Sequence, residues 1–309
     1  MKKIKILFAI ALMIGSANQL QAQQEAQFTQ YMDNMLYYNP AYAGSRDMMN
    51  ISVLHRQQWA GFKGAPMSTT FSLHTPLRYD NIGLGFSLLN DKLGPTNSTW
   101  FNADFSYSFK FKKNNSRLSF GVKGGINLLN GDLLNLVKHD QNDALVNVRF
   151  KNEVQPNVGV GIYYQSTQWF AGVAIPRIID NLKKAGDLSS IEYIAQRHYY
   201  LTLGGYIKAN RMLKIRPSTM LKITEQAPLA LDVSLAFIMY DKVWIGANYR
   251  LLESAGIMFQ YQFSNQFKIG YSFDYSTTKL RSYNYGTHEI LLSYDLLFKS
   301  KSLTSPRYF

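Results

Sequence analysis

The chain has 309 residues, and 33 Lys and Arg against 20 Asp and Glu give it a formal charge of +13. Only 17% of the residues are charged and 14% are aromatic, which excludes a disordered chain, poor in aromatic residues, and a coiled coil, rich in charges. Because cysteine is absent, disulfides, thiolate nucleophiles and zinc–thiolate sites are also excluded. No apolar run after the first residues approaches the roughly 20 residues of a membrane helix. A large, aromatic-rich β protein fits these limits.

The first 22 residues read as a secretory signal peptide. Lys2, Lys3 and Lys5 precede an apolar stretch from Ile6 to Ile14, and Ala22 is a small residue at a suitable cleavage point. The apolar stretch is too short to cross a bilayer as a helix. We therefore expect residues 1–22 to direct export and to be removed, which lowers the positive charge of the mature chain by three.

Alternation with a period of two dominates the mature chain and predicts strands with two different faces. In residues 101–111, one face carries Phe101, Ala103, Phe105, Tyr107, Phe109 and Phe111, and the other carries Asn102, Asp104, Ser106, Ser108 and Lys110. Small polar residues on one face and large aromatic residues on the other suit a membrane barrel with a polar lumen. A soluble β-sandwich inverts the arrangement, and alternation alone does not separate the two. The signal peptide, the number of strands and the aromatic content favour the barrel.

Turn signals divide the chain into about fourteen strands, near residues 48–57, 67–76, 82–89, 99–111, 117–129, 154–165, 168–177, 197–208, 213–223, 229–239, 243–251, 256–263, 267–277 and 287–298. The even-numbered connections are short, whereas most odd-numbered ones are long, including those near 59–67, 90–98, 130–153, 178–196 and 277–287. Outer-membrane barrels alternate short periplasmic turns with longer extracellular loops. We therefore predict an all-β fold, a transmembrane antiparallel β-barrel over residues 47–309 with both termini on the periplasmic side.

The segment 23–46 precedes the first predicted strand and follows neither the helical nor the strand period. It is rich in Gln, Tyr, Met and Asn, with a turn signal at Asn39-Pro40. A periplasmic extension, a plug folded into the barrel and an additional docking strand all fit this composition.

Motifs that carry catalysis or bind nucleotides are absent from the sequence. The five histidines form no HExxH pair, and neither a GxSxG elbow nor a P-loop occurs. Ser72 and His74 lie two apart on one predicted strand and would face the same side, so a barrel hydrolase acting on lipid remains an alternative. The cations are scattered, with pairs such as Lys112-Lys113 in turns, which indicates a cationic rim and not a nucleic-acid surface. We expect no enzymatic activity, metal, cofactor or nucleic acid.

Three motifs resemble a known family. They are QFTQYMDNMLYYNPAYAGSR (27–46), HRQQWAGFKGAP (55–66) and NDKLGP (90–95). With the ending SPRYF (305–309), they make the chain similar to the PorP/SprF family of type IX secretion proteins over essentially the whole mature chain. Met35 departs from the family's pattern, which often has Pro at this point.

The resemblance implies an outer-membrane β-barrel of the Bacteroidetes type that works in the secretion and gliding machinery beside periplasmic ring or lipoprotein subunits. Some members of the family are associated with export or surface retention of large cargo that carries a particular class of C-terminal domain. The family supplies no catalytic residues. Within the three motifs we select candidate partner contacts, namely Tyr37, Tyr38, Asn39, Pro40, Tyr42, Arg56, Trp59, Phe62 and Asp91.

Two functions follow from these observations. The first is a non-enzymatic barrel subunit of the type IX secretion machinery that supports export or surface anchoring of cargo. Its partners would be outer-membrane lipid, other type IX components and the C-terminal domain of the cargo or a surface adhesin. The alternative is a general diffusion porin for small solutes, because a polar inward face permits an open lumen.

Overall fold

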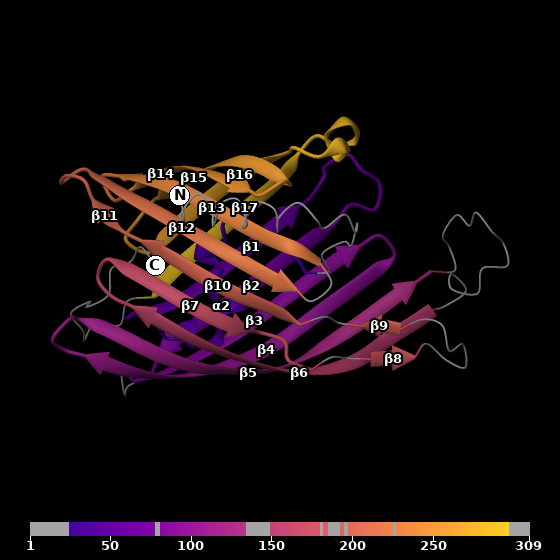
Figure 1. Cartoon of the computed structure of the whole chain (residues 1–309), viewed down its shortest axis with the longest axis horizontal. Helices are drawn as coiled ribbons and strands as arrows, with labels where there is room; N and C mark the ends of the chain where they lie inside the picture. The colour runs from indigo at the N-terminus through magenta and orange to yellow at the C-terminus, as the bar shows by residue number, and fades with distance from the viewer. Residues whose placement is uncertain are drawn as a thin grey trace, which may run out of the picture.

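The computed structural model describes residues 25–77, 81–133, 149–179, 182–184, 192–194, 197–224 and 227–296. Most of them form one antiparallel sheet that closes into a barrel (Figure 1). Its strands are β1 (Met49–Gln57), β2 (Met67–Pro76), β3 (Ile82–Leu93), β4 (Thr96–Phe111), β5 (Ser116–Asp132), β6 (Arg149–Gln165), β7 (Trp169–Ile175), β10 (His198–Gly205), β12 (Leu213–Thr224), β13 (Ala227–Met239), β14 (Val243–Arg250), β15 (Ser254–Gln262), β16 (Phe267–Ser276) and β17 (Thr287–Leu296). The short β11 (Ile207–Lys208) extends the line of β10, and β8 (Leu182–Lys184) pairs with β9 (Glu192–Ile194) in a separate ribbon.

Each of the fourteen wall strands pairs with a neighbour on each side. The first strand β1 pairs antiparallel with the last strand β17, with Val53 opposite Leu292. On the other side β10 pairs with β12, with Leu201 opposite Leu221. The predicted antiparallel barrel and its fourteen strands are confirmed. Residues 1–22 and 305–309, which carry the predicted signal peptide and the family-like ending, lie outside the described residues.

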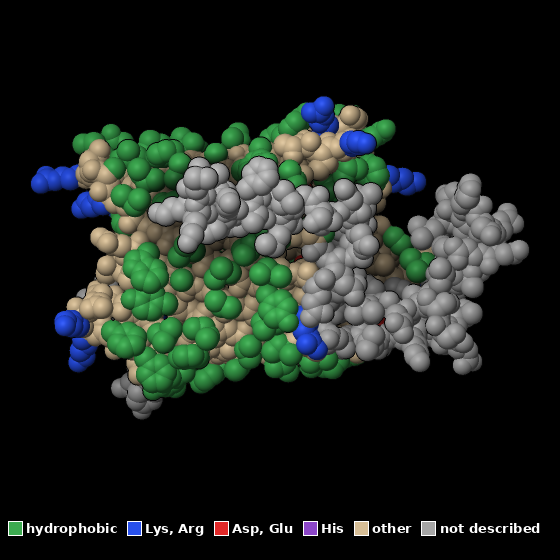
Figure 2. Space-filling view, in the orientation of Figure 1, with side chains coloured by type: hydrophobic (Ala, Val, Ile, Leu, Met, Phe, Trp, Pro, Cys, Tyr) green, Lys and Arg blue, Asp and Glu red, His purple; other side chains and the backbone are tan. Residues whose placement is uncertain are grey.

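The wall has the two faces that the alternation predicted. Along β4, Asn102, Asp104, Ser106 and Ser108 are buried against the lumen, whereas Phe105, Tyr107 and Phe109 are exposed on the outside. Figure 2 shows hydrophobic side chains over the outer face and Lys and Arg mostly at its two ends. Large apolar side chains therefore face lipid, as an outer-membrane barrel requires. Among the described residues, no helix is long and apolar enough to cross a membrane.

The two ends of the barrel differ in their connections. At the end where β1 begins and β17 ends, called the turn end here, short turns such as 112–115, 166–168 and 240–242 join the strands. The opposite end, called the loop end, carries longer connections such as 58–66 and 277–286. By the rule for outer-membrane barrels, the turn end is periplasmic and the loop end is extracellular.

One predicted loop was wrong. Residues 90–98 are not a loop, because β3 continues to Leu93 and β4 begins at Thr96, which leaves only Gly94 and Pro95 between them. The amide of Asn90 donates hydrogen bonds across this hairpin to Asn97 and to Thr99, each at 2.8 Å. At the loop end, β3 and β4 continue with polar residues, so the polar composition of residues 90–98 wrongly indicated a loop. For the same reason β5 and β6 reach into the predicted loop 130–153.

Candidate functional site in the barrel lumen

Residues 25–46, called the lumen segment here, lie inside the barrel. They form three short helical turns, η1 (Tyr31–Asp33), α2 (Met35–Tyr38) and η2 (Pro40–Tyr42), and the label of α2 lies near the middle of the barrel in the side view of Figure 1. All residues from 28 to 46 are buried, although no long helix or strand holds them. The last turn follows from the Asn39-Pro40 signal: the Asn39 side chain accepts a hydrogen bond from the Ala41 N–H at 2.9 Å and donates one to the Ile162 carbonyl at 3.0 Å.

The lumen segment runs along the barrel from the loop end to the turn end. At the loop end, Glu25 pairs with Arg177 at 3.1 Å, just beyond β7, and lies 3.4 Å from His198 at the start of β10. At the turn end, Arg46 pairs with Asp295 near the end of β17 at 3.2 Å. Of the three alternatives for the segment 23–46, a plug folded into the barrel fits this path. Although β1 begins at the turn end, residue 25 lies at the loop end.

Two buried carboxylates, those of Glu289 and Asp274, hold the lumen segment at Thr29 and Gln30. Glu289 on β17 accepts hydrogen bonds from the backbone N–H groups of Thr29 at 2.6 Å and Gln30 at 3.0 Å. Arg56 on β1 pairs with Glu289 and, at 2.9 Å, with Asp274 on β16. Glu289 thus satisfies two N–H groups that have no partner within a helix, Asp274 accepts a hydrogen bond from the Thr29 hydroxyl, and Arg56 pairs with both carboxylates.

Asp33 anchors the middle of the lumen segment to strands β12, β15 and β16. Its carboxylate pairs with Lys268 on β16, lies 3.9 Å from Arg216 on β12 and accepts a hydrogen bond from Gln260 on β15 at 2.8 Å. Burial alone would raise the pKa of Asp33, but the adjacent Lys268 and Arg216 hold that pKa far below its usual range. Asp33 is therefore ionised at neutral pH and compensated within the lumen.

Basic side chains from β5 bind the other side of the lumen segment through its carbonyl groups. Lys123 donates to the Leu36 carbonyl at 3.1 Å and to the Tyr37 carbonyl at 3.2 Å, and its ammonium lies 3.3 Å from Asp104. Arg117 donates to the Gly44 carbonyl at 2.9 Å. Opposite walls of the barrel therefore hold the same short stretch of chain, which fixes its position across the lumen.

Three wall glycines give the lumen segment its room. A Cβ on Gly121 would lie 2.2 Å from the backbone nitrogen of Ala41, and one on Gly83 would lie 2.1 Å from the Ala43 carbonyl oxygen. A Cβ on Gly161 would lie 2.1 Å from the side chain of Asn39. All three glycines lie within predicted strands, but the alternation did not predict that they make room for the lumen segment. Their place on the polar face of the alternation was the available signal, because a glycine there marks close approach of another backbone.

The candidate partner contacts fall into two groups. The first lies buried in the lumen and contacts the barrel itself; it comprises Tyr37, Tyr38, Asn39, Pro40, Tyr42 and Arg56. The second lies toward the loop end: Trp59 is partly buried, the Phe62 side chain is 46% exposed, and Asp91 on β3 accepts a hydrogen bond from Ser68 at 2.5 Å. Contact of either group with another protein stays a prediction. For the first group, such contact would require the lumen segment to move.

Ser72 and His74, the pair considered for hydrolysis, do not interact. The hydroxyl of Ser72 is hydrogen-bonded to Ser52 at 2.7 Å, and neither ring nitrogen of His74 has a hydrogen-bond partner. Over the described part of the chain, no group of three His, Asp or Glu side chains could hold a metal ion. The described lumen thus offers ion pairs and backbone contacts, and no nucleophile paired with a base at this position.

Comparison with known proteins gives a fold-level similarity to solved barrels. No curated protein matches the chain. The outer membrane protein Omp33 of Acinetobacter baumannii is 8% identical, over 82% of this chain and 100% of that chain, with a TM-score of 0.47. A Pseudomonas aeruginosa FadL homologue is 11% identical, over 83% and 92%, with a TM-score of 0.47. The KdgM porin is 9% identical, over 80% and 99%, with a TM-score of 0.37. Because these values are low, the similarities add nothing to what the barrel itself shows.

A family model gives the decisive match. The model described as "Type IX secretion system membrane protein PorP/SprF" matches residues 20–294, which is most of the chain. The matched region includes the lumen segment and the motifs at 27–46, 55–66 and 90–95, so the resemblance that these motifs indicated is confirmed. With its lipid-facing exterior, the barrel is an outer-membrane protein. The chain belongs to the PorP/SprF family of type IX secretion system membrane proteins.

Proposed function

We propose that this protein is a non-catalytic subunit of the type IX secretion and gliding machinery whose barrel is kept closed by the lumen segment. In this role it supports export or surface anchoring of cargo that carries a C-terminal domain, and it contacts periplasmic ring components. The single observation that carries the proposal is the position of residues 28–46, which are all buried inside the barrel and bonded to opposite walls.

The chemistry of the lumen favours a closed scaffold over a diffusion porin. Large side chains occupy the middle of the barrel, with Phe28, Tyr31 and Tyr38 at most 1% exposed. The buried charges that face them are paired with one another, as in Lys222 and Arg250 with Asp232 at 2.8 and 2.6 Å. A solute path needs water-accessible side chains along its length, whereas these groups are satisfied by the protein itself. A fourteen-stranded barrel has room for such a filling.

A closed barrel leaves its two ends as contact surfaces. The loop end carries the connection 58–66 with the exposed Phe62, and the turn end carries short turns with exposed cations such as Lys112. Under the proposal, cargo or adhesin contacts the loop end, and periplasmic ring or lipoprotein subunits contact the turn end. Exposed aromatic side chains are frequent anchors in protein interfaces.

Deletion of the gene in the native organism tests the proposed role. We expect the deletion strain to lose its C-terminal-domain cargo from the cell surface, and wild-type protein to restore it. Complementation with Phe62→Ser should restore display only in part. The matched control, Phe62→Tyr, keeps an aromatic ring at the same position and should restore display in full. Normal cargo display in the deletion strain would refute the proposed role.

The closed lumen is tested separately, with purified protein in planar bilayers. We expect no steady single-channel conductance from the wild-type protein. A regular conductance of porin size would instead support the diffusion porin. This measurement does not depend on cargo, so failure of the closed lumen and failure of the secretion role remain distinguishable.

A further inference from the structure

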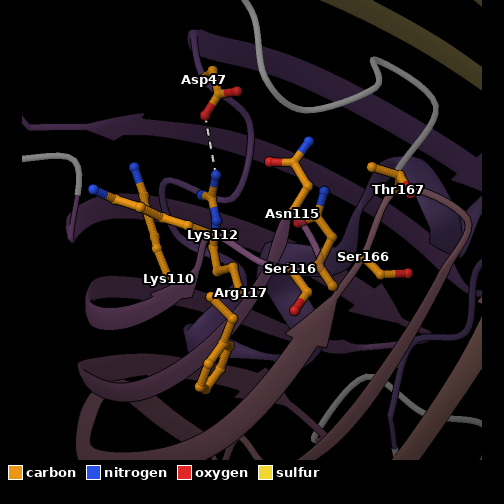
Figure 3. A pocket seen from close by; sticks show the side chains of 10 residues that line it. Asp47, Lys110, Lys112, Asn115, Ser116, Arg117, Ser166 and Thr167 are labelled. Atoms are coloured by element: carbon orange, nitrogen blue, oxygen red, sulfur yellow. Dashed lines mark hydrogen bonds and ion pairs between the residues drawn. The ribbon is translucent and has the colours of Figure 1, made fainter.

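A cavity of about 200 Å³ opens at the turn end of the barrel (Figure 3). Three parts of the chain that lie far apart in the sequence line it: the end of β4 with the turn into β5, the turn from β6 to β7, and Asp47, which joins the lumen segment to β1. The cavity therefore lies beside the point where the lumen segment leaves the barrel interior. By the orientation of outer-membrane barrels, this point faces the periplasm.

The lining of the cavity has the chemistry of an oxyanion site. Lys110, Lys112 and Arg117 supply three cations against the single carboxylate of Asp47. Hydroxyl groups of residues such as Ser116 and Thr167 add neutral hydrogen-bond donors. Lysine and arginine beside hydroxyl groups are the side chains that bind phosphate oxygens in proteins. The excess of positive charge makes an anion the favoured occupant.

The place of the cavity also points to the kind of anion. Phe111 ends β4 next to the two lysines, lines the cavity and is 47% exposed. Aromatic residues at the ends of barrel strands lie at the level of lipid headgroups. The cavity therefore lies at the level of the phosphate groups of the periplasmic leaflet, and the same cations would also bind a soluble phosphate compound.

We propose that this cavity binds a phosphate group, with Lys110 and Lys112 as its principal contacts. Arg117 connects the site to the lumen segment, because its guanidinium donates to Asp47 at 3.0 Å and to the Gly44 carbonyl at 2.9 Å. A bound phosphate competes with Asp47 for Arg117. Binding of an anion at the periplasmic face thus weakens the contact of Arg117 with Asp47, next to the part of the lumen segment at the turn end.

The test uses the full-length mature protein in uncharged detergent. Native mass spectrometry measures retention of phosphatidylglycerol against diacylglycerol, which lacks the phosphate, and calorimetry measures binding of inorganic phosphate. We expect the double variant Lys110→Gln/Lys112→Gln to weaken phosphate binding roughly 25-fold, from about fivefold for each basic residue near an anionic lipid. Asp47→Asn should strengthen it, since this change removes the competing carboxylate. The matched control, Lys208→Gln/Lys242→Gln, removes two exposed lysines at the same end, one on β11 and one in the turn 240–242.

The outcomes separate the sources of the phosphate. Retention of phosphatidylglycerol that is lost in the Lys110/Lys112 variant supports the site and assigns it to lipid. Binding of inorganic phosphate alone, with the same loss in that variant, supports the site and assigns it to a soluble ligand. Equal weakening by the Lys208/Lys242 control would show an effect of total charge and overturn the proposal, as would an absence of binding with both probes.

Discussion

Replacement of Asp33 by Ala should release the lumen segment from the barrel wall. In the native protein the Asp33 carboxylate compensates Lys268 and Arg216, and all three side chains are at most 9% exposed. Removing one partner of a buried ion pair costs about 3–5 kcal/mol, because the remaining charge stays buried without compensation. Lys268 lies next to the turn end, where water relieves part of that cost, so we take about 3 kcal/mol. This value increases the open fraction of the lumen segment roughly 150-fold, at about 1.4 kcal/mol per factor of ten.

The absence of cysteine from the chain makes this opening measurable. Ser45 is buried at 1% exposure, its hydroxyl has no hydrogen-bond partner, and cysteine has nearly the same shape. A thiol at this position, introduced as Ser45→Cys, reacts with a small maleimide only when the lumen segment opens. The rate of labelling in the Ser45→Cys background, with and without Asp33→Ala, gives the change in the opening equilibrium.

A control for this experiment uses an exposed ion pair. Arg149 and Asp132 lie 3.7 Å apart at the loop end, with side chains 63% and 37% exposed, and such pairs contribute at most about 1 kcal/mol. Asp132→Ala should therefore leave the labelling rate within about fivefold of the parent. If Asp33→Ala labels no faster than this control, the ion pairs do not hold the lumen segment and the reasoning fails.

Three further predictions concern the lumen segment and the wall. Gly121→Ala places a Cβ 2.2 Å from the backbone of the lumen segment, whereas Gly124→Ala meets nothing within 4 Å, so only the first should lower the midpoint of heat-induced unfolding on gels. The pKa of Asp33 is lowered in the folded protein, so its stabilisation is complete above the ordinary carboxyl pKa of about 4 and is lost as the pH falls from there through the lowered pKa. The unfolding midpoint should therefore drop below about pH 4, and drop less in Asp33→Asn. Phe105→Arg should lower the free energy of unfolding, measured by urea titration in bilayers, by about 2–4 kcal/mol, and Phe111→Arg should lower it by about 0–1 kcal/mol. The reason is that Phe105 lies near the membrane midplane and Phe111 near the membrane edge. Equal losses in the two variants would contradict the assigned membrane position.

The local pattern of β4 shows why the wall was predictable. Between residues 101 and 111, polar residues that face the lumen alternate with mostly aromatic residues that face lipid, and a strand in a barrel has no other way to place them. Strand ends were less predictable, as residues 90–93 show, because a strand that extends beyond the membrane carries polar residues like those of a loop. The pairing of β1 with β17 followed from closure, since an open edge is not tolerated in lipid.

The lumen segment shows the limit of sequence reasoning. Its composition allowed an extension, a plug or a docking strand, because its residues follow no period. Arg56 and Glu289, on β1 and β17, are far apart in sequence, and only the closed barrel brings them together beside Thr29. Likewise, Gly121 gains its role only when Ala41 lies against it.

By itself, the sequence determined the membrane barrel, its number of strands, the side of each strand that faces lipid, and the family. Those properties depend on composition, period and local motifs, all of which a linear chain displays. Only the tertiary structure decided that residues 28–46 fill the lumen, that residue 25 lies at the loop end, and that Lys110, Lys112 and Asp47 share one cavity. The physical reason is that these contacts join residues up to 260 positions apart, so their energies exist only once the barrel has closed.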